Sequence, residues 1–141
     1  MDVRSVMTAT PAFCTAETPL PDVAKMMADN DCGLIPVVDA NNTPIGVVTD
    51  RDIAVRIIAK GRDAKTSRAI DCMTTPVITV TDDSSLTECC DAMETHQVRR
   101  IPVVDASGHL CGIVSLADVA MSGRDQKIAE VVKHVSEPTS H

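Results

Sequence analysis

The chain contains the same segment twice, and this repeat constrains its fold more than any other feature. Residues Ile35–Ala54 read IPVVDANNTPIGVVTDRDIA, and residues Ile101–Ala120 read IPVVDASGHLCGIVSLADVA. The segments align without a gap at an offset of 66 residues, and 10 of their 20 positions are identical. A repeat of this length is one folding unit used twice. Two copies favour a closed pair, whose equivalent surfaces can face each other across a cleft, over a solenoid.

Both copies predict the same order of secondary structure. A short helical turn leads into a β-rich run, which is followed by a helix with apolar residues at i, i+3, i+4 and i+7. A hairpin of two strands and a closing helix complete a β-α-β-β-α unit. In the first copy the β-rich run is 13–15, the apolar stripe is Leu20, Val23, Ala24 and Met27, the strands are 36–39 and 45–48, and the closing helix is 50–60. In the second copy the run is 77–80, the stripe is Leu86, Cys89, Cys90 and Met93, the strands are 102–105 and 110–114, and the closing helix is 116–122.

The fold class that follows is α/β, of the α+β kind, with two pseudo-symmetric units packed as one module. We expect a first domain at 1–66, a second at 67–123, and a C-terminal helix and tail at 124–141. Each repeat alone, at about 60 residues, would be only marginally stable, so the two are expected to fold as one body. Cys89 and Cys90 align with Val23 and Ala24, which predicts core packing; a vicinal redox or metal role is the alternative.

Composition excludes several classes of function. The net charge is −7, and Phe13 is the only aromatic residue, so the chain lacks both the basic surface and the stacking platforms of nucleic-acid-binding proteins. No apolar run approaches the roughly 18 residues of a membrane span, and the N-terminus lacks the apolar stretch of a signal peptide. We therefore expect a cytoplasmic protein without nucleic-acid or membrane partners. Its six cysteines show no zinc-binding or C-x-x-C spacing and are expected to be mostly reduced and buried.

One motif ends the hairpin of each copy, GVVTDRD at 46–52 and GIVSLAD at 112–118. Its recurring residues are Gly46, Thr49 and Asp52 in the first copy and Gly112, Ser115 and Asp118 in the second. A hydroxyl residue followed three positions later by an acid is typical of a helix capping box. The same geometry suits a nucleotide, because the glycine leaves the strand end uncovered and the helix start attracts phosphate. The two interpretations are compatible, since an aspartate can cap the helix and also accept from ribose hydroxyls.

The duplicated β-α-β-β-α unit, the IPVVD strand and the G-x-x-[T/S]-x-x-D ending resemble CBS domains, of which a tandem pair forms a Bateman module. The resemblance covers about residues 2–122. It implies a regulatory, non-enzymatic module with no obligatory cofactor that senses AMP, ADP, ATP, S-adenosylmethionine, NAD or a related adenosyl ligand between the repeats. By position, Asp52 and Asp118 would bind ribose hydroxyls, and Thr49 and Ser115 would contact ribose or phosphate. The residues that would surround adenine are Ile35, Pro36, Ile101 and Pro102, together with Cys14, Val77 and Thr79 of the two β-rich runs.

The two copies differ in the arginines near the motif and the first hairpin strand. Arg51 aligns with Ala117, and the pair Arg99 and Arg100 aligns with Gly33 and Leu34. These arginines either lie on the solvated surface or line the ligand cleft, where a guanidinium is well suited to bind phosphate. The second interpretation predicts that the two ligand sites are not equivalent.

Two further functions remain as alternatives, a metal- or redox-responsive CBS protein and a dimerisation scaffold with vacant sites. The expected partners are an adenine-containing small molecule, a second copy of the chain in a homodimer, and an effector protein of unknown identity. The homodimer is expected because each repeat presents apolar helical stripes that a short chain has few layers to cover.

Overall fold

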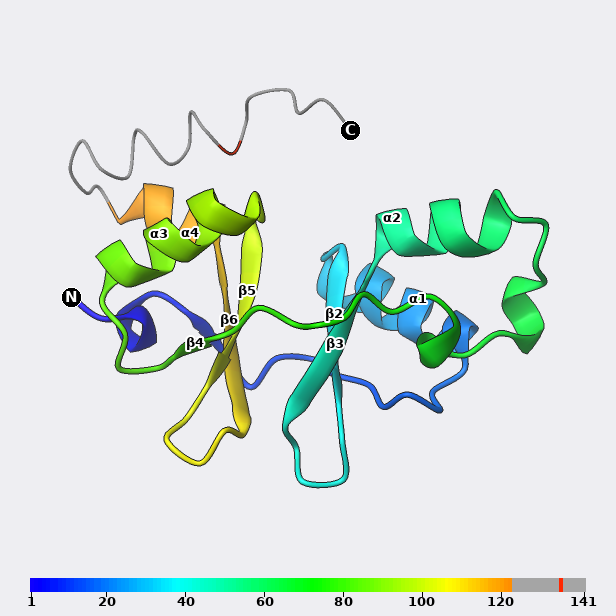
Figure 1. The fold of residues 1–141 in the computed structure, drawn as a ribbon, viewed down its shortest axis with the longest axis horizontal. Coiled ribbons are helices and arrows are strands. Elements are labelled where there is room, and N and C mark those ends of the chain that lie inside the picture. The colour runs from blue at the N-terminus through cyan, green and yellow to red at the C-terminus, as the bar shows by residue number, and fades with distance from the viewer. Residues whose placement is uncertain (123–134, 136–141) are drawn as a thin grey trace. The chain divides into compact units, whose positions relative to one another are not determined.

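The computed structural model describes residues 1–122 and residue 135, which form two compact units. One unit comprises Ala12–Val77, and the other comprises Met1–Pro11 together with the described residues from Ile78 onward. Figure 1 colours both units by position along the chain. None of the helices in this described part is long and apolar enough to cross a bilayer.

The unit at 12–77 is built around a hairpin and two helical segments. Strand β2 (Leu34–Val38) pairs antiparallel with β3 (Pro44–Thr49). The connecting turn is closed by the side chain of Asp39, whose Oδ1 accepts from two backbone N–H groups of the turn. Helix α1 (Leu20–Asn30) precedes the hairpin, and α2 (Asp50–Asp52) follows it and continues as a π-helix to Ile58. The core residues contributed by these elements include Leu20, Val23, Met27, Ile35, Val37, Val48 and Ile57.

The other unit repeats this plan with a larger sheet in the order β1-β6-β5-β4. Strands β5 (Arg100–Val104) and β6 (Leu110–Ser115) form the hairpin, while β1 (Thr8–Ala9) and β4 (Val80–Thr81) flank it. Helix α3 (Leu86–His96) lies before the hairpin and α4 (Leu116–Met121) after it. The core residues include Leu86, Cys89, Cys90, Met93, Ile101, Val103, Val114, Val119 and Val135.

Helices α1 and α3 end in the same way. Asp31 follows α1 with φ 48°, and Gln97 follows α3 with φ 54°, so the chain leaves each helix through a residue in the left-handed region. The two residues are 66 positions apart, so the repeat extends to the C-caps.

The segment before each repeat, called the lead-in segment (3–8 and 69–74), packs on the hairpin of the other repeat. A 3₁₀ helix at Val3–Ser5 leads to Thr8, which pairs with Ile113 of β6. A second 3₁₀ helix at Ala69–Asp71 leads to Thr74, which forms an antiparallel bridge with Val47 of β3. The compact units therefore divide the chain at other positions than the sequence repeat, and the domain boundary at 66/67 stays a prediction.

The predicted α+β units are confirmed, with helix and strand ends shifted by only a few residues. The two β-rich runs are the exception. The run at 13–15 is reduced to a single parallel bridge between Cys14 and Val37, and of the run at 77–80 only Val80 is in a strand. Both runs lie at the edge of a sheet, where one or two residues reach the neighbouring strand. Most of the predicted C-terminal helix lies outside the described residues, although Val135 is buried.

Candidate ligand-binding site

Both motifs form a complete capping box with nearly identical geometry. Thr49 Oγ1 accepts from the backbone N–H of Asp52 at 3.0 Å, and Asp52 Oδ2 accepts from the backbone N–H of Thr49 at 3.0 Å. In the second motif the corresponding distances between Ser115 and Asp118 are 3.0 and 3.1 Å. The end of each strand thus places a hydroxyl beside a carboxylate in the first turn of the following helix, as the capping interpretation predicts.

The motif glycines have a different role from the one expected. A Cβ on Gly46 would lie 2.9 Å from the carbonyl oxygen of Thr74, and a Cβ on Gly112 would lie 2.5 Å from Met7 Sδ and 3.0 Å from the carbonyl oxygen of Thr8. The space beside each glycine is filled by the lead-in segment that pairs with the strand. The expectation that these glycines leave the strand end open for a ligand is therefore wrong, because the chain itself approaches too closely for any side chain.

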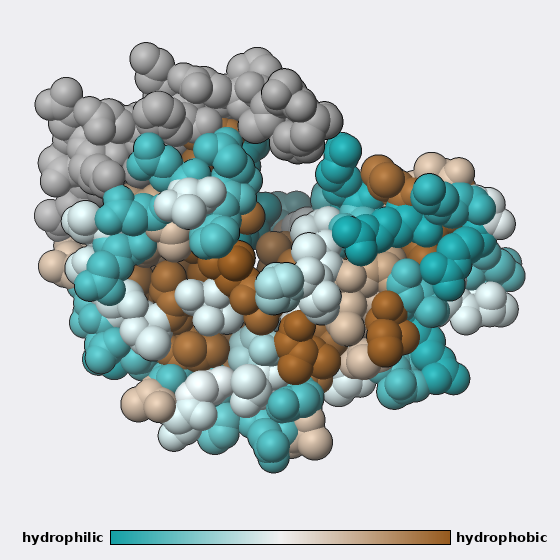
Figure 2. All heavy atoms as spheres, viewed as in Figure 1, coloured by the Kyte–Doolittle hydropathy of each residue, from teal (hydrophilic) through white to brown (hydrophobic). Residues whose placement is uncertain are grey.

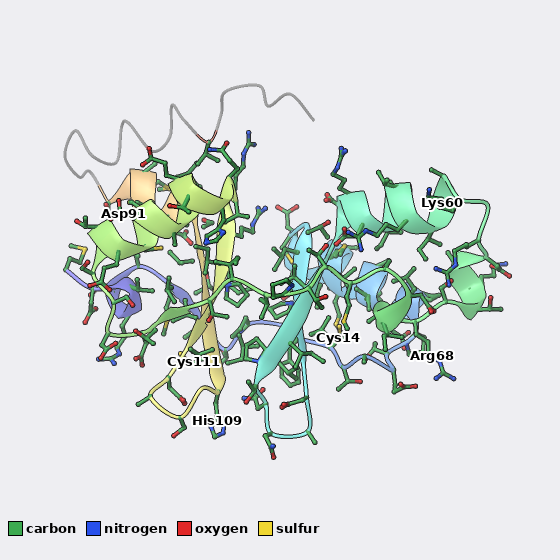
Figure 3. The ribbon with its side chains drawn as sticks, viewed as in Figure 1. Cys14, Lys60, Arg68, Asp91, His109 and Cys111 are labelled. Carbon is green, nitrogen blue, oxygen red and sulfur yellow. The ribbon has the colours of Figure 1, made fainter. Side chains whose placement is uncertain are left out.

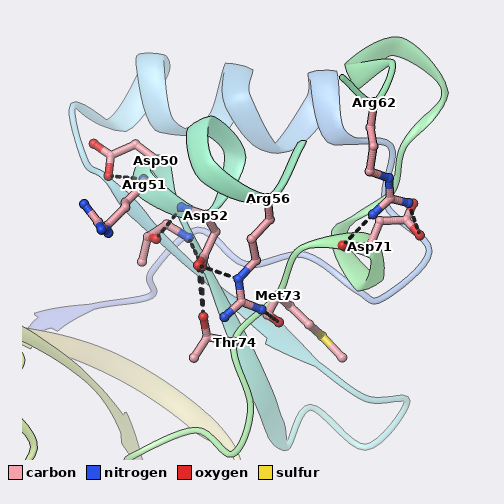
Figure 4. A network of polar contacts seen from close by, with 9 residues as sticks. Asp50, Arg51, Asp52, Arg56, Arg62, Asp71, Met73 and Thr74 are labelled. Atoms are coloured by element: carbon pink, nitrogen blue, oxygen red, sulfur yellow. Dashed lines mark hydrogen bonds and ion pairs between the residues drawn. The ribbon is translucent and has the colours of Figure 1, made fainter. Parts of the chain in front are cut away.

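A polar network surrounds the Asp52 carboxylate (Figure 4). Thr74 Oγ1 lies 3.1 Å from each carboxylate oxygen, and Arg56 Nε lies 3.6 Å from Oδ1. Arg56 also donates from Nη1 to the carbonyl oxygen of Met73 at 3.3 Å. Asp52 is one of two buried polar residues in the described part of the chain, and the network provides its partners.

The Asp118 carboxylate has a simpler environment. Its only hydrogen-bond donor among the described residues is the backbone N–H of Ser115, and its side chain is partly exposed. Position 122, which aligns with Arg56, is a serine whose hydroxyl donates to the carbonyl oxygen of Val119 at 2.6 Å. The two motifs therefore share their backbone geometry but differ in what contacts the carboxylate.

The candidate arginines lie on the surface. Arg51, Arg99 and Arg100 are exposed, and none forms an ion pair with another described residue. Arg99 anchors the second motif through its backbone, since its carbonyl oxygen accepts from the N–H of Leu116 at 2.7 Å. The exposed guanidinium groups leave both the surface role and the phosphate-binding role open.

The residues predicted to surround adenine fall into two groups. Ile35 and Ile101 are fully buried in the two cores, Pro36 and Pro102 are buried beside them, and the backbone of Cys14 bonds to β2. Val77 and Thr79, from the β-rich run of the second copy, are partly exposed. Contact of any of these residues with adenine stays a prediction.

The cysteines and the described histidines form no reactive centre. Cys14 and Cys111 belong to different units (Figure 3), and the six cysteines form no disulfide. Burial raises the pKa of Cys14 to about 11 and that of Cys89 to about 12, which disfavours the thiolate. Cys89 and Cys90 are fully buried in the core, as predicted. Among the described residues no three His, Cys, Asp or Glu side chains converge as metal ligands.

Sequence reasoning missed two residues of the site, Thr74 and Arg56. Thr74 carries a signal, because the dipeptide Met-Thr recurs at 7–8 and 73–74 at the offset of the repeat. Arg56 carries none, since an arginine at this helical position looks like any surface residue and its aligned partner is a serine.

Comparison with known proteins identifies the family to which this chain is similar. The family model for the CBS domain matches residues 3–59 and 68–134. An uncharacterized protein of Methanopyrus kandleri is 33% identical over 116 residues, which are 82% of this chain and 57% of that protein. Hypoxic response protein 1 of Mycobacterium tuberculosis is 32% identical over 135 residues, 96% of this chain and 94% of the relative.

Two solved structures share this fold. The crystal structure of Hypoxic Response Protein I with two coordinated zinc ions has a TM-score of 0.77 and 34% identity, covering 86% of this chain and 98% of the other. The structure of CBSX2 of Arabidopsis thaliana in complex with AMP has a TM-score of 0.73 and 27% identity, covering 86% and 95%.

Proposed function

We propose that this chain, which belongs to the CBS domain family, is a regulatory module that binds an adenosyl nucleotide and passes the binding on as a conformational change. The family model confirms the membership that the repeated motif predicts. The observation that carries the proposal is the convergence of a hydroxyl and a carboxylate at the same place in both units, in the same geometry. The module would act through its partners and would catalyse no reaction of its own.

The chemistry of the motif suits a nucleoside. A carboxylate offers about four acceptor positions, and each capping box uses one of them for a backbone N–H. The remaining positions can accept from the two adjacent hydroxyls of a ribose. Exposed arginines at 51, 99 and 100 provide cations for phosphates. With one aromatic residue in the chain, the adenine would pack against aliphatic side chains and backbone.

A structural neighbour supports this class of ligand, and the described residues of this chain do not favour a metal. CBSX2, a structural neighbour at 27% identity, is seen in complex with AMP. Hypoxic Response Protein I is seen with two zinc ions, but we do not extend zinc binding to this chain, whose described residues offer no cluster of three metal-ligating side chains.

A thermal-shift panel tests the proposal. The panel contains AMP, ADP, ATP, S-adenosylmethionine and NAD, with GMP and CMP as base controls, and an extrinsic dye reports unfolding. We expect at least one adenosyl compound to raise the melting temperature while GMP and CMP do not, because a ligand that binds only the folded state stabilises it. Calorimetry then measures the affinity. No response to any adenosyl compound, in either assay, would contradict the proposal.

We further propose a homodimer that forms through the helices following the motifs. Val55 and Met121 are 66 positions apart, and both are exposed, at 43% and 88%, while Ile58 on the first of these helices is 60% exposed. Figure 2 shows hydrophobic residues reaching the surface between hydrophilic ones on one face. Apolar side chains that recur at one position of both repeats are typical of a symmetric interface. A monomeric mass in sedimentation at micromolar concentration would contradict the dimer.

The same proposal assigns the protein to the cytoplasm, where adenosyl nucleotides are abundant and the cysteines would remain reduced. Its effector protein is a partner still to be identified, and co-purification with and without the best ligand of the panel is the direct way to find it.

A further inference from the structure

We infer that the two motif aspartates have different roles: Asp52 is held by an internal polar latch, and Asp118 is the carboxylate that accepts the ribose hydroxyls. Each chain would then bind one adenosyl ligand, through its second motif. The latch is defined as the contacts among Asp52, Thr74 and Arg56. The inference rests on the proposed function, since it assigns the nucleoside to one motif of the two.

Three groups of the chain already contact the Asp52 carboxylate. Oδ2 accepts from the backbone N–H of Thr49 at 3.0 Å, and the Thr74 hydroxyl lies 3.1 Å from both Oδ1 and Oδ2. Arg56 approaches Oδ1 at 3.6 Å, and the Asp52 side chain is 11% exposed. A ribose at this carboxylate would have to compete with the Thr74 hydroxyl and with the Arg56 cation at a side chain that has little exposed surface.

Asp118 has more open acceptor positions than Asp52. Only the Ser115 N–H donates to it among the described residues, at Oδ2, so Oδ1 and the second lone pair of Oδ2 remain open to a ligand. Its side chain is partly exposed, and none of the described cations pairs with it. An open, unpaired carboxylate forms charge-assisted hydrogen bonds, each worth about tenfold to a hundredfold in affinity.

The difference originates in one side chain rather than in the backbone. Thr8 aligns with Thr74, is also a threonine, and pairs with the equivalent residue of its hairpin strand. Arg56, by contrast, aligns with Ser122, which is too short to join a carboxylate to the lead-in segment. Arg56 contacts both Asp52 and the carbonyl oxygen of Met73, the residue before Thr74, and so holds the lead-in segment where its threonine reaches the carboxylate.

Calorimetry with AMP and with S-adenosylmethionine tests the assignment on the full chain. The matched variants are Asp118→Asn and Asp52→Asn, which keep the size of the side chain and remove its charge. We expect one equivalent of ligand per wild-type chain, an affinity at least about tenfold weaker for Asp118→Asn, and an affinity within about threefold of wild type for Asp52→Asn. Circular dichroism of each variant verifies that it is folded.

A measurement without ligand tests the latch itself. Double-mutant cycles of unfolding combine Asp52→Asn with Thr74→Val, and Asp118→Asn with Thr8→Val as the matched control. We expect a coupling of at least about fivefold in the unfolding equilibrium constant for the first pair and none for the second. Equal coupling in both pairs would overturn the latch.

The outcomes separate this inference from the proposed function. Two equal binding sites per chain, or a larger loss for Asp52→Asn than for Asp118→Asn, would overturn the inference while the proposed function stands. Binding of neither probe by the wild-type chain would overturn the ribose assignment together with the proposed function for these ligands.

Discussion

Replacing Gly46 by alanine probes the contact between the lead-in segment and the hairpin. The new Cβ would lie 2.9 Å from the carbonyl oxygen of Thr74, 3.1 Å from Thr75 Cγ2 and 3.3 Å from Met73 Sδ. The nearest of these atoms is backbone, and it takes part in a bridge in which Thr74 and Val47 exchange hydrogen bonds of 2.7 and 3.1 Å. The segment must therefore move, and both bonds weaken.

The cost follows from these contacts. Overpacking of this kind costs about 1–3 kcal/mol, and each weakened hydrogen bond adds up to about 1 kcal/mol. The lower entropy of the unfolded alanine variant offsets about 0.4–1 kcal/mol. We expect Gly46→Ala to lose about 2 kcal/mol of unfolding free energy, in urea denaturation followed by far-UV circular dichroism. A loss below about 0.5 kcal/mol, the range of ordinary surface substitutions, would refute the close approach.

Gly112→Ala is the matched comparison, since its new Cβ meets the flexible Met7 Sδ first, at 2.5 Å, and then Met7 Cγ and the carbonyl oxygen of Thr8, each at 3.0 Å. We expect Met7→Ala to relieve part of the cost of Gly112→Ala. In contrast, Met73→Ala should relieve little of the cost of Gly46→Ala, where the clash is with backbone. Large relief by Met73→Ala would contradict the backbone clash at Gly46, and no relief by Met7→Ala would show that backbone sets the cost at Gly112 as well.

Three further outcomes are expected. Ser85→Ala should cost about 1 kcal/mol of stability in urea denaturation, because Ser85 Oγ caps α3 by accepting a backbone N–H at 3.1 Å; an unchanged midpoint would contradict this. Stability should fall as pH rises from about 9, because folding raises the pKa of Cys14 to about 11 and that of Cys89 to about 12 and the unfolded thiols ionise first; Cys14→Ala should flatten the pH profile. Arg99→Ala combined with Arg100→Ala should weaken ATP about tenfold more than adenosine in calorimetry at low salt, and equal losses would remove the phosphate role.

The hairpins and the main helices could be predicted from the sequence because local periodicity encodes them. The stripe of Leu86, Cys89, Cys90 and Met93 places both cysteines on the buried face of α3, and the structure confirms this. The turn residues between the strands likewise fix each hairpin within a few residues of its observed ends. These signals depend only on residues close together in the sequence, so the spacing of apolar and turn residues is enough to predict the elements.

The pairing of each lead-in segment with the hairpin of the other repeat could not be predicted in the same way. Thr8 pairs with Ile113, and Thr74 with Val47, across separations that leave no periodic signal in either partner. The sequence alone therefore predicts that the motif glycine makes room for a ligand, whereas the structure shows that Gly46 makes room for Thr74 of the same chain. A residue whose role depends on a distant segment needs the fold before its role can be assigned.

The difference between the two motifs was predicted in kind but from other residues. The alignment of the repeats predicts this difference from Arg99 and Arg100, whose side chains are exposed and unpaired among the described residues. The structure adds Arg56, aligned with Ser122, as the residue that changes the carboxylate environment. Alignment shows that a charge differs between the repeats, but only the packed structure shows which charge reaches the motif.

A crystal structure of the chain grown with AMP tests the central claim most directly. The account predicts one AMP per chain, with both ribose hydroxyls within about 2.7 Å of the Asp118 carboxylate oxygens and with Thr74 still bonded to Asp52. A ribose bound to Asp52 in place of the Thr74 hydroxyl would contradict the account, as would AMP bound away from both motifs.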